Sequence, residues 1–134
     1  MSPMSRSARD LALRIVGIAD SKMADDIVAL DVAEILGYTD VLIICTARNE
    51  RQAKAIHDEV HVRLKHEDEL LPRRVEGLPE ARWVLLDYLD CILHIFVPET
   101  RDLYRLDQLW GEGPRIDLGE AVSVESPARA AGEG

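Results

Sequence analysis

Apolar residues recur along the chain at spacings that predict distinct elements. Residues 5–23 repeat about every 3.6 positions, which is typical of an amphipathic helix. A β-branched run at 27–32 predicts a strand, and the continuous apolar run at 41–46 predicts another strand, covered on both faces. Between these strands, residues 34–36 have the length of one helical turn, and residues 37–40 predict a tight turn.

A longer helix is predicted to begin after Asn49, a favourable N-cap residue, and to end before Pro72. Its buried stripe is expected to consist of Ala53, Ile56, His57, Val60 and Leu64. Residues 73–76 then have the length of a short strand.

A β-hairpin is predicted from residues 82–87 and 90–97, joined by a two-residue turn at Tyr88–Leu89. Short helices are expected to follow at residues 99–103 and 106–110.

The order of these elements predicts the fold class α/β, with one mixed sheet flanked by helices. The strands on either side of the long helix are expected to be parallel, with a right-handed crossover. The 134 residues suit a single domain, which we place at residues 1–113. The small and polar residues 114–134 are expected to form a flexible C-terminal tail.

Side-chain alternation divides the predicted hairpin into two faces. One face is wholly apolar and is expected to be core: Val84, Leu86, Cys91, Leu93 and Ile95. The other, mixed face also carries Phe96, and a two-residue turn would form three cross-strand pairs on it: Trp83 with His94, Leu85 with Ile92, and Asp87 with Asp90.

The mixed face has several interpretations. Two opposed carboxylates suit the solvated end of a hairpin, a metal-binding pair, or an acidic tip for a basic partner. Trp83 and His94 suit either packing beneath a helix or a half-buried partner surface.

The net charge is −9, and this value argues against a direct nucleic-acid site, because phosphate binding requires a Lys/Arg patch. An acidic protein suits a basic partner such as a ribosomal protein, although the charge also serves solubility. No apolar run approaches the roughly 20 residues of a membrane span, and the N-terminus lacks the pattern of a signal peptide. We therefore expect a cytoplasmic protein with no membrane site.

Residues suited to catalysis are few. Cys45 and Cys91 lie in apolar runs and are expected to be buried and reduced, and no glycine loop suits a phosphate. His57 and His61 have i, i+4 spacing, but no further ligand completes a metal site, so neither metal nor cofactor is expected. We expect that the protein is not an enzyme. The alternative is a nucleotide- and Mg²⁺-dependent transferase that uses Asp87 and Asp90.

Short motifs follow one another in a characteristic order between residues 27 and 110. They are Thr39–Asp40, Thr46 with Arg51–Gln52, Glu76–Gly77, Trp83 with Leu86–Asp87–Tyr88, His94 with Phe96, Arg101 with Tyr104, and Leu109–Trp110. In this order and spacing the chain resembles the ribosomal silencing factor family, RsfS, also called iojap-like.

The resemblance implies a five-stranded mixed sheet with a nucleotidyltransferase-like shape but without that chemistry. It also implies binding to large-subunit ribosomal protein uL14, a steric block of subunit joining, and repression of translation when nutrients are scarce. Family members are described as able to dimerise. An interaction module for another basic partner is the remaining alternative.

Residue chemistry and resemblance together suggest a partner-binding surface around the hairpin. Its candidate residues are Trp83, Asp87, Tyr88, Leu89, Asp90, His94, Phe96, Arg101 and Tyr104. Arg101 and Tyr104 have a second interpretation, in which they pin the short helix to the sheet. At the hairpin turn the family usually has glycine, and Leu89 there would cost about 1 kcal/mol if its φ is positive.

Overall fold

The computed structural model describes residues 6–104 and 114–122. In chain order its elements are α1 (Arg6–Ser21), β1 (Asp25–Asp31), α2 (Ala33–Leu36), β2 (Val41–Thr46), α3 (Glu50–Asp68), β3 (Arg74–Glu76), β4 (Trp83–Asp87), β5 (Cys91–Phe96), α4 (Pro98–Tyr104) and the 3-10 helix η1 (Gly119–Ala121). These bounds agree with the predicted elements to within one or two residues for every strand. The helix predicted at 106–110 lies outside the described residues.

The five strands form one mixed sheet in the order β1-β2-β5-β4-β3. β2 pairs with β5 in parallel, and the other neighbouring strands are antiparallel. The parallel pair predicted on either side of the long helix is therefore confirmed, since β2 precedes α3 and β5 follows it. Every residue of β2 and β5 is buried, as expected for strands at the centre of a sheet.

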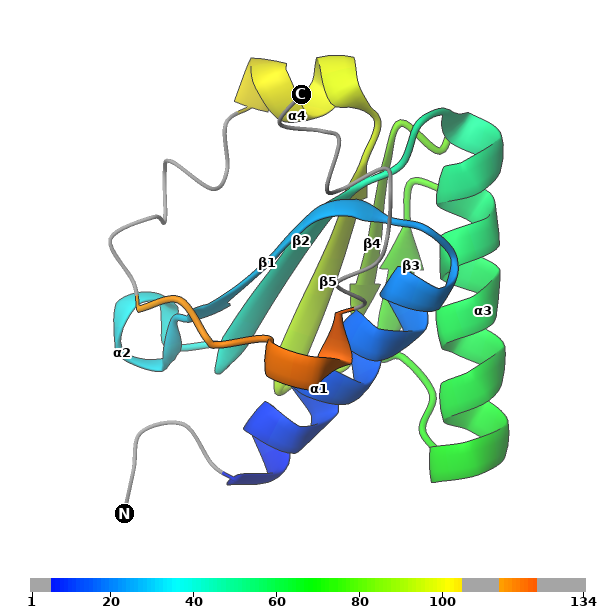
Figure 1. Cartoon of the computed structure of the whole chain (residues 1–134). Coiled ribbons are helices and arrows are strands. Elements are labelled where there is room, and N and C mark those ends of the chain that lie inside the picture. Colours follow the sequence, from blue (N-terminus) through cyan, green and yellow to red (C-terminus); the bar gives the residue numbers. More distant parts are fainter. Residues whose placement is uncertain (1–5, 105–113, 123–134) are drawn as a thin grey trace.

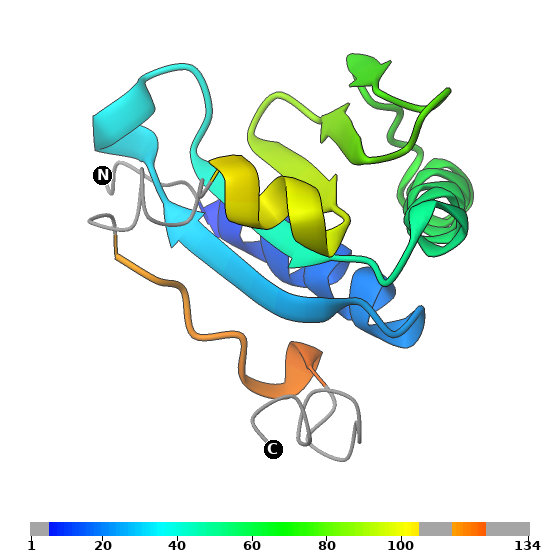
Figure 2. The ribbon, with the colours of Figure 1, turned by 90° about the horizontal axis from the view of Figure 1, so that it is seen from above.

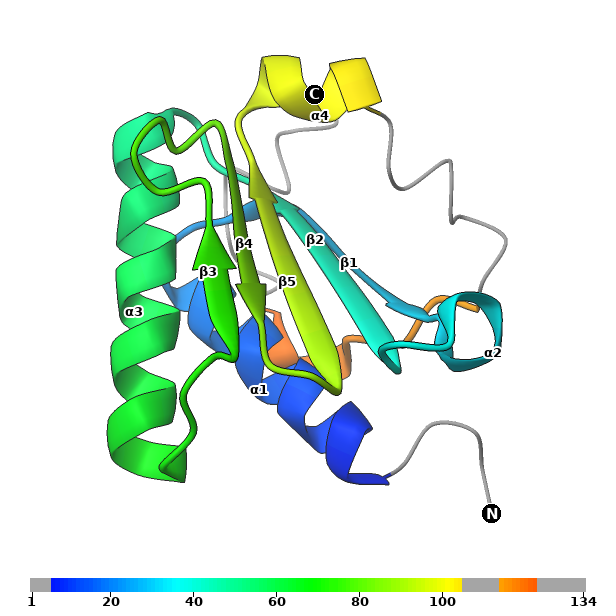
Figure 3. The ribbon, with the colours of Figure 1, turned by 180° about the vertical axis from the view of Figure 1, so that it is seen from behind.

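Helices α1 and α3 pack on one face of the sheet (Figure 1). The main core lies between them and the sheet, and it includes the whole predicted apolar face of the hairpin: Val84, Leu86, Cys91, Leu93 and Ile95. A second cluster of buried apolar residues lies on the opposite face: Leu30, Val32, Leu42, Ile44, Ile92 and Phe96. Figure 3 shows α4 at one end of the sheet and α2 near the other. No helix in the described part combines the length and apolar character needed to cross a bilayer.

Local signals set both ends of α3. The side chain of Asn49 accepts a hydrogen bond from the Gln52 N–H at 2.9 Å, which confirms the predicted N-cap. At the other end, Glu69 adopts a left-handed conformation with φ 53° and closes the helix. The predicted stripe is buried throughout: Ala53, Ile56, His57, Val60 and Leu64.

The hairpin turn lies one residue further along the chain than predicted. The Tyr88 N–H donates to the Cys91 carbonyl at 2.9 Å, so the turn residues are Leu89 and Asp90, with the Asp87 carboxylate accepting from the Leu89 N–H. The observed cross-strand pairs are Trp83 with Phe96, Leu85 with His94, and Asp87 with Ile92. The predicted pairs were therefore wrong, but each partner moved by two positions, so every side chain within β4 and β5 keeps its predicted face, while Asp90 lies in the turn.

The first part of the predicted tail lies along the sheet. The N–H groups of Asp31 and Ile116 donate to the carbonyls of Pro114 and Ala29, both at 2.8 Å. Ile116 is buried in the main core, and Figure 2 shows the segment running beside β1. The folded part thus extends beyond residue 113, because the edge of β1 and the Ile116 side chain hold residues 114–122; residues 123–134 lie outside the described part.

Candidate partner-binding site

Three rings of the mixed face pack together at the end of the hairpin farther from its turn. The ring centroids of Trp83 and Phe96 are 4.9 Å apart, and the rings of His94 and Phe96 are stacked at 6.0 Å. The Trp83 Nε1–H donates to His94 Nδ1 at 2.9 Å. Trp83 and His94 are thus neighbours, as predicted, although they are not directly opposite one another. We call these three residues the aromatic cluster.

Gly77 lets the backbone approach the aromatic cluster closely. Its φ is 89°, and a Cβ atom added there would lie 1.9 Å from the carbonyl oxygen of Trp83. Only glycine fits such an approach. The Glu76–Gly77 motif therefore has a structural role beside Trp83.

His94 contributes shape and a hydrogen bond, not charge. Its burial lowers its pKa from 6.5 to about 4, because an imidazolium would lose its hydration. The ring is therefore neutral at pH 7. Since Nδ1 accepts the Trp83 N–H, the ring proton lies on Nε2.

Asp87 organises the hairpin tip from below the surface. It is 1% exposed, and its carboxylate accepts the Leu89 N–H at 2.8 Å. The same carboxylate pairs with Arg73 at 3.0 Å and lies 3.6 Å from Arg74. The guanidinium groups of Arg73, just before β3, and Arg74, its first residue, therefore compensate the negative charge of Asp87. Asp87 does not face Asp90 in an opposed carboxylate pair.

The turn presents one side chain and buries its neighbour. Leu89 has φ 75°, and the Asp90 N–H donates to the Tyr88 carbonyl across it at 2.9 Å, which is the strained form of a γ-turn. Leu89 is 51% exposed. Tyr88 is buried in the main core, where desolvation raises its pKa above the ordinary value. Leu89 thus adopts the positive φ for which a cost of about 1 kcal/mol was expected.

A second turn lies against the hairpin tip. The carbonyl of Asp90 accepts the N–H groups of Asp40 and Val41, each at 3.0 Å. These two hydrogen bonds hold the α2–β2 turn beside the β4–β5 turn. Next to them, desolvation raises the pKa of the Cys91 thiol to about 12, with smaller contributions from the carboxylates of Asp90 and Asp40.

Arg101 pins α4 to the sheet. One guanidinium nitrogen donates to the Asp26 carbonyl and to Thr46 Oγ1, both at 2.8 Å. This is the second of the two interpretations that the sequence left open for Arg101. Tyr104 ends α4, and its side chain lies outside the described residues.

The predicted contact residues differ in solvent exposure. Four are buried: Asp87, Tyr88, His94 and Phe96. Three are half-buried: Trp83, Asp90 and Arg101. Of the candidates whose side chains the structure describes, Leu89 alone is more than half exposed. Because buried side chains offer little surface to a partner, we infer that the first four hold the accessible ones in position.

Two accessible residues beside the tip were not among the candidates. Ile35 and Tyr38 are each at least half exposed. Tyr38 is the one aromatic residue outside 83–110, and it follows Gly37 in a predicted turn. Its place in a predicted turn is typical of an exposed residue, whereas no local signal in the sequence placed it near the hairpin.

Comparison with protein-family models identifies the family of this chain. The family described as "Ribosomal silencing factor during starvation" matches residues 5–133. This chain belongs to the RsfS family. The predicted resemblance is confirmed.

Relatives support the RsfS assignment over most of the chain. The ribosomal silencing factor of Halalkalibacterium halodurans is 34% identical over 117 residues, covering 87% of this chain and 99% of the relative. The Bacillus subtilis factor is 38% identical over 107 residues, covering 79% and 90%. A crystal structure of a Bacillus halodurans protein matches with a TM-score of 0.71 and 33% identity, covering 81% of this chain and 98% of that chain.

This RsfS protein keeps its thiols and imidazoles in structural settings. Burial raises the pKa of Cys45 to about 12, with Arg101 partly opposing the rise. His57 Nδ1 lies 2.8 Å from the Asp58 carboxylate, and the rings of His57 and His61 are 5.5 Å apart. Within residues 6–104 and 114–122, no three His, Cys, Asp or Glu side chains gather as a metal site would require.

Proposed function

We propose that this protein represses translation by binding the large ribosomal subunit through ribosomal protein uL14. Bound there, it would cover the face on which the small subunit docks, so that the two subunits could not join. Such repression would act in the cytoplasm when nutrients are scarce. The observation that carries the proposal is the family match over residues 5–133.

Charge supports a basic ribosomal partner. The chain has a net charge of −9, and Leu89 stands beside the partly exposed Asp90 at the hairpin tip. Acidic and basic surfaces attract one another over several ångströms, which raises the association rate and selects the partner.

The geometry favours binding over catalysis. A nucleotidyltransferase would use paired carboxylates to hold Mg²⁺, and Asp87 and Asp90 were the candidates. Asp87 is instead buried and paired with Arg73. We infer that the protein is not an enzyme. Calorimetry with Mg²⁺ and nucleoside triphosphates should detect no heat of binding. A saturable heat of binding would instead support the transferase function.

Subunit joining gives the direct test. Purified large and small subunits are mixed in a Mg²⁺ buffer, and association is followed by light scattering and on sucrose gradients. We expect saturating protein to prevent joining and to sediment with the large subunit.

The order of addition tests the steric mechanism. Protein added before the subunits meet should block joining fully, whereas protein added to joined ribosomes should act only as fast as they dissociate. Unchanged association at saturating protein would reject the proposal. Loss of binding when uL14 is omitted from reconstituted large subunits would identify the partner.

A further inference from the structure

Three exposed apolar residues lie on segments at the same end of the sheet (Figure 3). Ile35 on α2, Tyr38 after it, and Leu89 at the hairpin turn are each at least half exposed. We call this set the tip surface. Scattered exposed apolar residues are ordinary, but a group of them marks an interaction site.

Backbone pairing makes the tip surface a single unit. The Asp90 carbonyl binds the N–H groups of Asp40 and Val41, and Val41 pairs with Cys91 in the parallel ladder. Leu36 packs on the second apolar cluster and anchors α2. Helix α2 with the turn after it and the hairpin turn are therefore fixed relative to one another, and Figure 3 shows them at the same end of the sheet.

The conformation of Leu89 is costly for the fold. A non-glycine residue with φ 75° is strained, and a glycine there would have no such penalty. Its exposed side chain is held outward by the hydrogen bond from its N–H to buried Asp87. A strained residue that contributes little core burial is expected where its side chain has another use.

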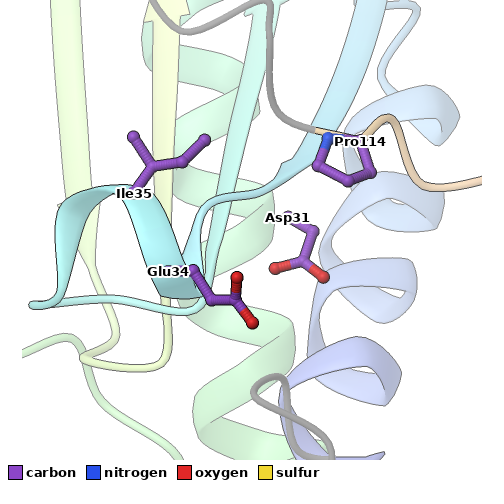
Figure 4. Close-up of a pocket in the computed structure, with 4 residues that line it drawn as sticks. All are labelled: Asp31, Glu34, Ile35 and Pro114. Atoms are coloured by element: carbon purple, nitrogen blue, oxygen red, sulfur yellow. The ribbon is translucent and has the colours of Figure 1, made fainter.

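Four carboxylate residues lie on or next to the segments that form the tip surface. They are Asp31, Glu34, Asp40 and Asp90, and each is exposed or half-buried. Within the described part of the chain, none of the four forms an ion pair with a lysine or arginine. Figure 4 shows the carboxylates of Asp31 and Glu34 turned toward the same space, in a pocket that Ile35 and Pro114 also line.

We propose that the tip surface is the docking site for a basic protein, with Ile35, Tyr38 and Leu89 as apolar anchors and the surrounding carboxylates as partners for lysine and arginine. This rests on the proposed function: the partner is the basic ribosomal protein exposed on the large subunit. Apolar anchors ringed by charge are the usual organisation of a specific interface. The aromatic cluster then supports the hairpin from its other end.

The test measures binding of fluorescently labelled full-length variants to purified large subunits. Leu89→Gly removes an anchor and also relieves the strain of a positive φ, so we do not expect weaker binding to come from unfolding, and urea unfolding of each variant checks this. Met23→Gly is the matched control: Met23 is an exposed apolar residue with φ 66° that lies before β1, at the opposite end of the sheet. We expect Leu89→Gly with Tyr38→Ser to raise Kd at least about tenfold, and Met23→Gly to change it less than about twofold.

The outcomes separate this proposal from the function on which it rests. If the wild type binds large subunits and all variants bind equally well, the docking site is wrong and the function stands. If the wild type does not bind large subunits, both are wrong. If the variants change only the protein's self-association in analytical ultracentrifugation, the tip surface binds a second copy and the proposal is also overturned.

Discussion

Trp83 and His94 share a hydrogen bond that only one protonation state of the histidine permits. Nδ1 of His94 accepts the indole N–H at 2.9 Å, and it can do so only while it carries no proton. Protonation would both charge a buried ring and remove this acceptor. Protonation of His94 therefore links the stability of the mixed face to pH.

The pH dependence has a defined sign. The pKa of His94 is about 4 in the fold, against 6.5 for a solvent-exposed histidine, so the unfolded chain binds more protons between these values. The free energy of unfolding should thus fall as pH drops from 6.5 to 4, by about 3 kcal/mol in total. Urea unfolding at several pH values measures this loss.

His94→Gln is the control for that experiment. Glutamine can still accept the Trp83 N–H but does not titrate. The wild-type curve minus the variant curve removes the contribution of the carboxylates and should retain the fall between pH 6.5 and 4. Parallel curves would show that His94 is not responsible.

At the scale of elements, β1 depends on a segment far away in the chain. Residues 114–118 bind its outer edge by two backbone hydrogen bonds, and η1 packs on α1. An edge strand left open is prone to pair with other chains. This segment therefore both adds core burial through Ile116 and covers the edge of β1.

Two truncations test the role of this segment. A chain ending at residue 122 keeps it, and a chain ending at residue 113 lacks it. We expect the longer chain to unfold like the full protein and the shorter one to lose about 2 kcal/mol or more, since burial of one isoleucine side chain has roughly that value. Urea titrations and gel filtration measure stability and edge-to-edge association. Equal stability of the two truncations would contradict this role.

At the scale of the molecule, acidity and the tip surface act together. The net charge of −9 attracts a basic partner from a distance, and the apolar anchors act only on contact. The two contributions differ in their response to salt, because screening weakens charge attraction over about 10 Å at 0.1 M and leaves apolar burial nearly unchanged.

Binding to large subunits should therefore weaken as salt rises at constant Mg²⁺. We expect Kd to increase several-fold between about 50 and 200 mM KCl, mainly through slower association. The variant Glu34→Gln with Asp90→Asn should show a shallower dependence, because it removes two of the carboxylates at the tip. A salt dependence equal in the variant and the wild type would place the attractive charge elsewhere.

Much of the fold could be predicted because its signals are local. The apolar run at 41–46, the Asn49 cap and the alternation of the hairpin depend on neighbouring residues, and each is present as expected. The register of the hairpin was missed because Leu89 adopts a positive φ that leucine disfavours. In that conformation the Leu89 N–H binds buried Asp87, whose carboxylate pairs with Arg73 from another segment.

The sequence by itself determined the elements, the face on which each hairpin side chain lies, and the family to which the chain belongs. Only the tertiary structure decided which of those side chains a partner can reach. It buried Phe96 and Asp87, and it brought the turn that follows Tyr38 beside the turn that carries Leu89. The reason is physical: the alternation of a strand is set by bonds between neighbours, whereas burial is set by whatever packs against it from elsewhere in the chain.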